Sequence, residues 1–339
     1  MASRTVAIQF IRAAIESARL HGLDIQEALW RAHITKELIG RDATRVTPAQ
    51  ASRVIQALWN ATDDELLGVG PKPVPRGTFR MMTLGLIHVA DLATALQRLV
   101  EFSQIATGFE AIEMTVDGST TRLSFDPRRQ PAQTDQLVTD IVMTVVHRFA
   151  GWLIGQRIPL ISVDLPLTAP AHAAEYLLIY GVSPTFEADG AAMTFASRYL
   201  SAPVVRSEDE LIKFLRRSPN DLLFRQDFDP TTSSRVRKVI ERKRPDEAVM
   251  VEDIAKRLNV SAQHLRRLLR EEGTSFREIK EEILRDEAIA SLVRGRETVE
   301  ALSDRLGFSE PSAFRRAFRR WTGSPPGSYR PVAEAAGTG

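Results

Sequence analysis

The stretch GFSEPSAFRRAFRRWTGSPPGSYR, residues 307–330, combines arginines with large aromatic side chains. Its apolar residues recur at i, i+3, i+4 and i+7, so they share one face of a helix: Phe314, Ala317, Phe318 and Trp321. The arginines fall on the opposite side: Arg315, Arg316, Arg319 and Arg320. A guanidinium group can pair with a phosphate or with O6 and N7 of guanine, so this side could bind a nucleic acid; arginines that are merely solvated are the alternative.

The same order of features occurs 48 residues earlier. VEDIAKRLNVSAQHLRRLLREEGTS begins at Val251, and VEALSDRLGFSEPSAFRRAFRRWTGS begins at Val299. In each, a short amphipathic helix leads through a turn to a serine that can cap a second helix, Ser261 or Ser309. That second helix carries two adjacent arginines between apolar positions. One such segment is a weak signal, but two in tandem predict a pair of helix-turn-helix units, whose second helices can lie in the major groove of DNA.

The charge distribution agrees with a polyanionic partner for the C-terminal third. The formal net charge is only +2. Residues 231–330, however, carry an excess of six positive charges, whereas residues 1–230 carry an excess of three negative charges. The basic residues are therefore concentrated in the part of the chain that contains the repeat.

The totals limit the kinds of protein this chain can be. A length of 339 residues predicts two domains or three, and the absence of cysteine excludes a disulfide framework, a thiolate metal site and a cysteine nucleophile. The first twenty residues contain charged side chains and lack the apolar centre of a signal peptide. The longest stretch without Asp, Glu, Lys or Arg, Tyr176–Phe186, has 11 residues, too few to span a bilayer. We expect a cytoplasmic, nucleoid-associated protein without a membrane partner.

Motifs typical of enzymes are not apparent in the sequence. His172 and Glu175 lie three residues apart on a predicted helix, but no third metal ligand accompanies them. The sequence has neither a phosphate-cradling glycine-rich loop nor a nucleophile elbow. We therefore expect no enzymatic activity, no catalytic residue, no bound metal and no cofactor.

The N-terminal two thirds mix helical and strand patterns, which predicts an α+β domain. Helices are predicted over Ile8–Leu20, after Thr47 as N-cap with Pro48 as the first helical residue, after Asp91 as N-cap, over residues 134–155 and over residues 207–219. Strands are predicted over residues 158–167 and in hairpins around Asp117-Gly118 and Asp189-Gly190. In the last helix, Leu211, Phe214 and Leu215 could form a dimer seam or pack inside their own domain.

Residues from about 235 to 330 resemble the DNA-binding domain of the AraC/XylS family of bacterial transcription regulators. The resemblance is carried by IAKRLNVSAQHLRRLLREEGTSF, LRDEAIASLV and ALSDRLGFSEPSAFRRAFRRWTGSPPGSYR. Leu269 stands where many members have phenylalanine, and the segment from Leu269 to Gly273 is one residue shorter than in the commonest form. Residues 5–205 are similar, more weakly, to the effector-binding and dimerisation domain of one branch, through GTFRMMTLGLIHVADLATALQRLVEFSQI and YGVSPTFEADGAAMTFASRYLSAPV.

This resemblance implies a domain order and a set of partners. We expect an α+β effector and dimerisation domain over residues 5–224, a linker over 225–234, an all-α double helix-turn-helix domain over 235–331 with a linker helix near Phe276–Arg294, and a disordered tail over 332–339. The expected partners are double-stranded promoter DNA, RNA polymerase, an unidentified small-molecule effector and a second copy of the chain. A regulator or architectural factor that needs no effector is the alternative, and an activator is expected rather than a repressor.

The resemblance also implies which side chains contact DNA. Base edges would be read by Gln263, Arg266, Arg267, Pro311, Ser312, Arg315 and Arg316. Phosphates would be contacted by Ser261, Arg270, Arg319, Arg320 and Arg330. Arg80 and His88 are candidate polar liners of the effector pocket, although a structural role is an open alternative for both.

Overall fold

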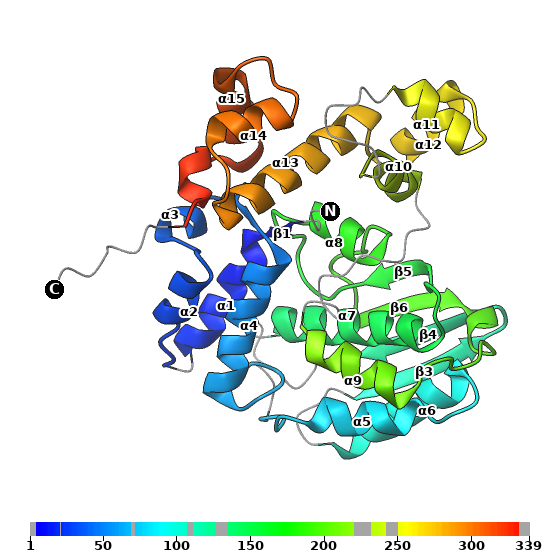
Figure 1. Cartoon of the computed structure of the whole chain (residues 1–339). Helices are drawn as coiled ribbons and strands as arrows, with labels where there is room; N and C mark the ends of the chain where they lie inside the picture. The colour runs from blue at the N-terminus through cyan, green and yellow to red at the C-terminus, as the bar shows by residue number, and fades with distance from the viewer. Residues whose placement is uncertain are drawn as a thin grey trace. The chain divides into compact units, whose positions relative to one another are not determined.

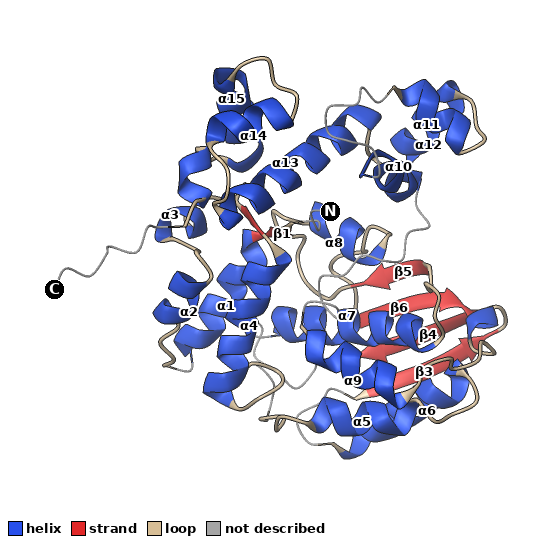
Figure 2. Ribbon diagram, in the orientation of Figure 1, coloured by secondary structure: helices blue, strands red, loops and turns tan. Residues whose placement is uncertain are grey.

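The computed structural model describes residues 5–20, 22–68, 72–106, 111–125, 135–219, 232–241 and 250–331, without the side chains of residues 17, 135, 136 and 138 (Figures 1 and 2). The chain divides into two compact units. Unit 1 comprises Met1–Ile8, Leu29–Ala51 and Asp229–Gly339, and unit 2 comprises Gln9–Ala28 and Ser52–Phe228. None of the helices in the described part of the chain combines the length and apolar character needed to cross a bilayer.

Unit 2 contains a four-stranded antiparallel sheet and several helices. The strands follow the order β3-β4-β6-β5 and comprise β3 (Ile112–Asp117), β4 (Thr120–Phe125), β5 (Leu160–Asp164) and β6 (Ala191–Ala196). The helices are α1 (Ile8–Leu20), α2 (Gln26–Arg31), α4 (Pro48–Thr62), α5 (Thr78–Leu86), α6 (Leu92–Ile105), α7 (Asp135–Leu153), α8 (Ala174–Tyr180), the 3-10 turn η1 (Ser197–Tyr199) and α9 (Glu208–Arg217). Helices α1, α2 and α4 also give some of their residues to unit 1.

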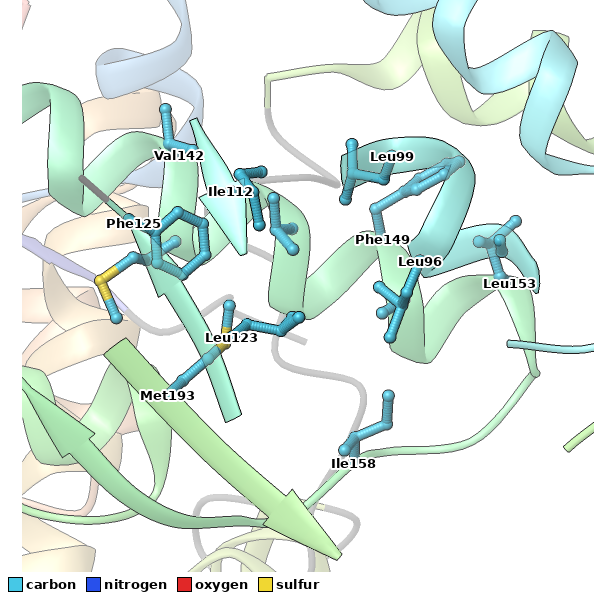
Figure 3. Packing of buried hydrophobic residues seen from close by; sticks show 14 of the residues in the cluster. Leu96, Leu99, Ile112, Leu123, Phe125, Val142, Phe149, Leu153, Ile158 and Met193 are labelled. Atoms are coloured by element: carbon cyan, nitrogen blue, oxygen red, sulfur yellow. The ribbon is translucent and has the colours of Figure 1, made fainter. Parts of the chain in front are cut away.

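The core of unit 2 lies where side chains of the sheet meet those of α6 and α7. Figure 3 shows Leu123 and Met193 from the strands, Leu96 from α6 and Phe149 from α7 within one packed cluster. Leu211 of α9 is completely buried in the same cluster. Helix α9 therefore packs inside its own unit, which was one of the two alternatives raised for this helix.

Most of the predicted elements of unit 2 are confirmed. The helix over Ile8–Leu20 has the predicted bounds. Thr47 accepts a hydrogen bond from the Gln50 amide at 3.2 Å, and Asp91 accepts one from the Thr94 amide at 2.9 Å, so both residues cap the helices that they were predicted to cap. The hairpin around Asp117-Gly118 joins β3 to β4.

The second predicted hairpin, around Asp189-Gly190, is wrong. Only its second arm is a strand, β6, and both edges of β6 are already paired, one with β4 and the other with β5. Residues 184–188 make a single isolated bridge instead, between Thr185 and Asp164, and Glu187 has a φ of 58°, which breaks an extended chain. A local turn signal cannot reveal that a strand has no free edge.

Unit 1 contains the two predicted helix-turn-helix segments at either end of one long helix (Figure 1). Its C-terminal helices are α10 (Thr232–Glu241), α11 (Val251–Arg257), α12 (Ala262–Glu271), α13 (Phe276–Arg294), α14 (Val299–Arg305), α15 (Pro311–Thr322) and the 3-10 turn η3 (Pro326–Tyr329). Helix α13 spans the residues expected of the linker helix. We call α10–α12 with the start of α13 the first subdomain, and the end of α13 with α14, α15 and η3 the second subdomain.

Residues from the beginning of the chain complete unit 1. They comprise strands β1 (Val6–Ala7) and β2 (Arg45–Val46), which pair antiparallel, and the short helix α3 (Lys36–Ile39), which contacts η3. Leu38 of α3 is completely buried in the core of the second subdomain. Of the predicted linker over 225–234, residues 225–231 lie outside the described residues, and residues 232–234 form the start of α10. The predicted tail over 332–339 also lies outside the described residues.

Candidate nucleic-acid interface

In the first subdomain, an apolar face holds α12 while a polar face stays in solvent. Ser261 caps α12 by accepting a hydrogen bond from the His264 amide at 3.1 Å. Leu265 and Leu269 are completely buried against α11 and α13. The predicted base readers Gln263, Arg266 and Arg267 are all exposed on the other side of α12.

In the second subdomain, α15 presents its residues in the same way. Phe314 and Phe318 are completely buried, whereas Ser312, Arg315 and Arg316 are exposed and Pro311 is partly exposed. The aromatic stripe of the sequence is therefore the core face of this helix, as its spacing predicted.

The predicted cap of α15 is wrong. Residue Glu310, not Ser309, occupies the N-cap, and no side chain caps the helix; Pro311 is its first residue. The second turn is one residue longer than the first, so Ser309 falls one position too early to cap. Proline tolerates the first helical position because its missing N–H has no partner there in any case.

Both subdomains hold the first arginine of their pair with a glutamate from the preceding helix. Arg266 lies 2.9 Å from Glu252 of α11, and Arg315 lies 2.6 Å from Glu300 of α14. All four side chains are more than half exposed. Exposed ion pairs contribute little stability, about 0–1 kcal/mol, so these arginines can exchange glutamate for a phosphate or a base at small cost.

The second arginines of the two pairs differ in their surroundings. Arg267 lies near the acceptor nitrogen of His264, at 3.2 Å, and near Glu271, at 3.7 Å. Arg316 makes no ion pair with any residue that the structure describes. Arg316 therefore offers its whole guanidinium fork to a ligand.

The five predicted phosphate contacts fall into three groups. Arg270 and Arg319 are exposed and make no ion pair within the described ranges, and Arg320 is exposed and lies 3.4 Å from Glu281. The hydroxyl of Ser261 is exposed but already caps α12. Arg330 is partly buried and donates to the carbonyl oxygen of Glu297, so its guanidinium is tied to the protein.

Helix α13 connects the two subdomains. It has 19 residues and is therefore about 28 Å long. Its first half packs in the core of the first subdomain through Ile279, and its second half packs in the core of the second through Ala288 and Leu292. Both subdomains therefore pack against the same helix. We call their second helices, α12 and α15, the recognition helices.

One buried ionic cluster in unit 1 has no counterpart in the sequence analysis. Asp286 of α13 is fully buried and accepts hydrogen bonds from Arg237 of α10 at 2.7 Å and from the hydroxyl of Thr5 at 2.5 Å. Burial by itself would raise the pKa of Asp286, but Arg285 and Arg237 outweigh burial and lower it, so the carboxylate is ionised. The one signal in the sequence is that two charged residues, Arg237 and Asp286, fall on the otherwise apolar faces of their helices.

The two residues that the sequence suggested as liners of an effector pocket, Arg80 and His88, lie on the surface of unit 2. Both side chains are exposed, and the structure does not bring them together with buried polar groups. A cluster of buried polar groups lies instead on α7 and α8. The hydroxyl of Tyr176 donates to Asp140 at 2.8 Å, and burial raises the pKa of Asp140 to about 7 despite that bond.

One oxygen atom of this buried group, Oδ1 of Asp140, has no hydrogen-bond partner among the described residues, whereas the hydroxyl of Tyr180 lies near Thr144. The rings of Tyr176 and Tyr180 are stacked with centroids 6.1 Å apart, and His172 stacks on Tyr176 at 6.0 Å. His172 is therefore part of an aromatic stack. The part of the chain that the structure describes contains no group of three His, Asp or Glu residues arranged to hold a metal ion.

Comparison with protein families agrees with both halves of the chain. The family model described as "Arabinose-binding domain of AraC transcription regulator, N-term" matches residues 22–204, more than half of the chain. A model described as "Helix-turn-helix domain" matches residues 254–331, which contain both recognition helices.

Individual relatives are regulators. The chain is 25% identical over 326 residues to the "Ornithine utilization regulator" of Pseudomonas aeruginosa, covering 96% of each chain. It is 38% identical over 86 residues to the "HTH-type transcriptional regulator VqsM" of the same species, which covers 25% of this chain and 26% of that one. Among solved structures, the transcriptional regulator CdpR from Pseudomonas aeruginosa covers 95% of this chain and 97% of its own at 19% identity, with a TM-score of 0.33. The chain belongs to the AraC family of transcription regulators.

Proposed function

We propose that the protein reads two adjacent major-groove segments of a bacterial promoter, and that a small molecule bound to unit 2 controls this reading. The observation that carries the first part is the repeated surface of α12 and α15. Each helix exposes an arginine pair directly after a buried apolar residue, and α13, about 28 Å long, connects the two subdomains that carry these helices. An enzyme or a structural protein has no need for two such surfaces.

The roles of the individual side chains follow from their chemistry. Gln263, Arg266 and Arg267 on α12 and Ser312, Arg315 and Arg316 on α15 read base edges, with the arginines suited to guanine and the glutamine to adenine. Pro311 contributes shape and apolar contact. Arg270, Arg319 and Arg320 contact phosphates, with lesser contributions from Ser261 and Arg330, and set the salt dependence of binding.

The proposed effector site is supported by the unpartnered Oδ1 atom of Asp140 in unit 2. A buried oxygen without a partner costs about 1–3 kcal/mol, and a ligand that donates a hydrogen bond to Asp140 beside Tyr180 would recover that energy. These residues are a better candidate than Arg80 and His88, which are exposed and suit only a ligand bound at the surface. The relative named for ornithine utilisation makes ornithine a reasonable first compound to test.

Three further parts of the proposal come from the family resemblance alone. The protein acts as a homodimer, it activates transcription, and it contacts RNA polymerase while bound to promoter DNA. A regulator that binds DNA without any effector is the alternative, and its unit 1 would be the same.

The proposal is tested by selecting sites from random and genomic DNA with the purified full-length protein, followed by footprinting. We expect a discrete protected site spanning two successive major grooves, and recovery of no site at low ionic strength would contradict DNA reading. Thermal-shift measurements with ornithine, arabinose and other small polar molecules test the effector. A stabilising compound should lose its effect on Asp140→Asn but keep it on His88→Ala, whereas identical footprints with and without every compound would favour the effector-free alternative.

A further inference from the structure

The buried cluster around Asp286 joins three parts of unit 1 that are distant in sequence. Its Oδ2 atom accepts from Nη2 of Arg237 at 2.7 Å, which ties α10 of the first subdomain to α13. Its Oδ1 atom accepts from the hydroxyl of Thr5 at 2.5 Å, which ties α13 to the strand pair at the beginning of the chain. Thr5 in turn accepts from Nε of Arg45 at 2.8 Å.

Asp286 lies where the two cores of unit 1 meet along α13. Ile283, three residues before it, packs with the first subdomain, and Ala288, two residues after it, is buried in the second. Apolar packing is non-directional, so the aliphatic core of the first subdomain could hold α10 and α12 at more than one angle to α13. A hydrogen-bonded ion pair has a fixed geometry and removes that freedom.

The charges around the carboxylate show that it is held firmly. Arg237 is 8% exposed in its side chain and also bonds Glu241 at 2.7 Å, while Arg285 lies 3.3 Å from Asp286. Buried ion pairs are weak contributors to stability when compared with apolar replacements, but they can specify one arrangement of helices over others. A specifying role is therefore the one that this position suits.

We propose that Asp286 is a positioning residue that fixes the separation and angle of the two recognition helices, and so makes the protein select DNA by the spacing between its two half-sites. This inference rests on the proposed DNA-reading function. Through Thr5 and Arg45, the strand pair β1–β2 supports the same carboxylate from the other side. Asp286 itself is fully buried and contacts no DNA.

The test uses the full-length protein and the DNA site that it selects, together with the same site carrying one base pair fewer, one more or two more between its halves. Each base pair shifts one half by about 3.4 Å and rotates it by roughly a tenth of a turn. We expect the wild type to lose about 10-fold or more in affinity per step, because one set of base contacts is lost. In Asp286→Asn the preference should shrink to about threefold or less, since the neutral amide holds Arg237 only weakly.

Two further variants keep the test decisive. Thr5→Val removes one hydrogen bond and leaves the Arg237 pair intact, so it should fold and show an intermediate preference. Ile254→Val lowers the stability of the first subdomain from within its core, away from Asp286, and should keep the wild-type preference even where its affinity falls. The spacing preference is the ratio of the affinities of one variant for two DNA sites. Partial unfolding lowers both affinities by the same factor, so it cannot change this ratio.

The outcomes separate the two proposals. If the wild type, Thr5→Val and Asp286→Asn all show the same spacing preference, the role of Asp286 is overturned and DNA reading stays in place. The same conclusion follows if the wild type binds all spacings equally well. Failure to select any site would overturn the proposed function, and the role of Asp286 with it.

Discussion

The two helix-turn-helix subdomains share a surface but differ in how they are held together. The first has an aliphatic core whose buried members all come from residues 236–279. The second is built around Phe314, Phe318 and Tyr329, and it also buries Leu38 from the beginning of the chain. The repeat therefore preserves the exposed side with its arginine pair, while the two cores beneath it are built from different residues.

The difference continues at the ends of the helices. In the second subdomain, Gly323 ends α15 with a φ of 71°, and Arg41 donates to its carbonyl oxygen. The backbone amide of Arg45 lies 3.4 Å from the hydroxyl of Tyr329. Within the described ranges, the core of the first subdomain includes no residue from the start of the chain. The second subdomain therefore depends on residues 29–51 in a way that the first does not.

The largest expected effect tests whether the two cores are separate. Phe318→Ala should lower the free energy of unfolding by about 3–5 kcal/mol, because it leaves a large cavity beside Tyr329. Hydrogen exchange should then accelerate in α14 and α15 while α11 and α12 stay protected. Leu269→Ala, at the equivalent place in α12, should give the opposite pattern. Equal acceleration in both subdomains for both variants would show one cooperative core.

The next prediction tests the contribution of Leu38, which belongs to α3 but is buried in the core of the second subdomain. Leu38→Ala should destabilise the second subdomain by about 2–5 kcal/mol, although Leu38 is far from that subdomain in sequence. Hydrogen exchange of the α14 and α15 amides at increasing denaturant concentration measures it. Leu20→Ala is the matched control, because Leu20 is 50% exposed and should change little. A Leu38→Ala protein as stable as the control would contradict the assignment of α3 to this core.

A smaller effect compares the exposed sides. Arg316→Ala should cost about 1–3 kcal/mol of binding to the selected DNA and relax the choice at one base pair. Arg315→Ala should cost less, because Arg315 must first give up Glu300. Binding isotherms on selected and random DNA provide the measurement. Equal losses on both DNAs would mean that Arg316 contacts the backbone and not a base.

The smallest effect concerns the phosphates. Arg320→Ala should weaken binding to every sequence alike and lower the slope of log K against log salt by about one. Arg270→Ala should do the same in the first subdomain. An Arg320→Ala protein with an unchanged slope would indicate that its contact with Glu281 persists on DNA.

The sequence predicted what depends on local pattern. The two helix-turn-helix segments, the arginine pairs on one side of their second helices and the apolar faces beneath them follow from spacing, and they are confirmed. The linker helix Phe276–Arg294, which the family resemblance implied, is confirmed as well. The family and the fold class are confirmed as well.

What the sequence could not predict depends on contacts between distant residues. The hairpin at Asp189-Gly190 failed because β6 has no free edge, and the cap at Ser309 failed because one extra residue shifts the start of α15. The placement of Leu38 and Thr5 in the C-terminal unit needed the three-dimensional structure, since no pattern in residues 5–51 refers to a partner nearly three hundred residues away.

The strand pair β1–β2 has a consequence for how the protein is made. Thr5 and Asp286 are separated by 281 residues, so the ribosome releases one of them long before the other exists. The first subdomain can close as soon as α13 has left the exit tunnel, but the second must wait for Leu38 and Arg41 to be retrieved from a part of the chain synthesised much earlier. We therefore expect the second subdomain to close after the first.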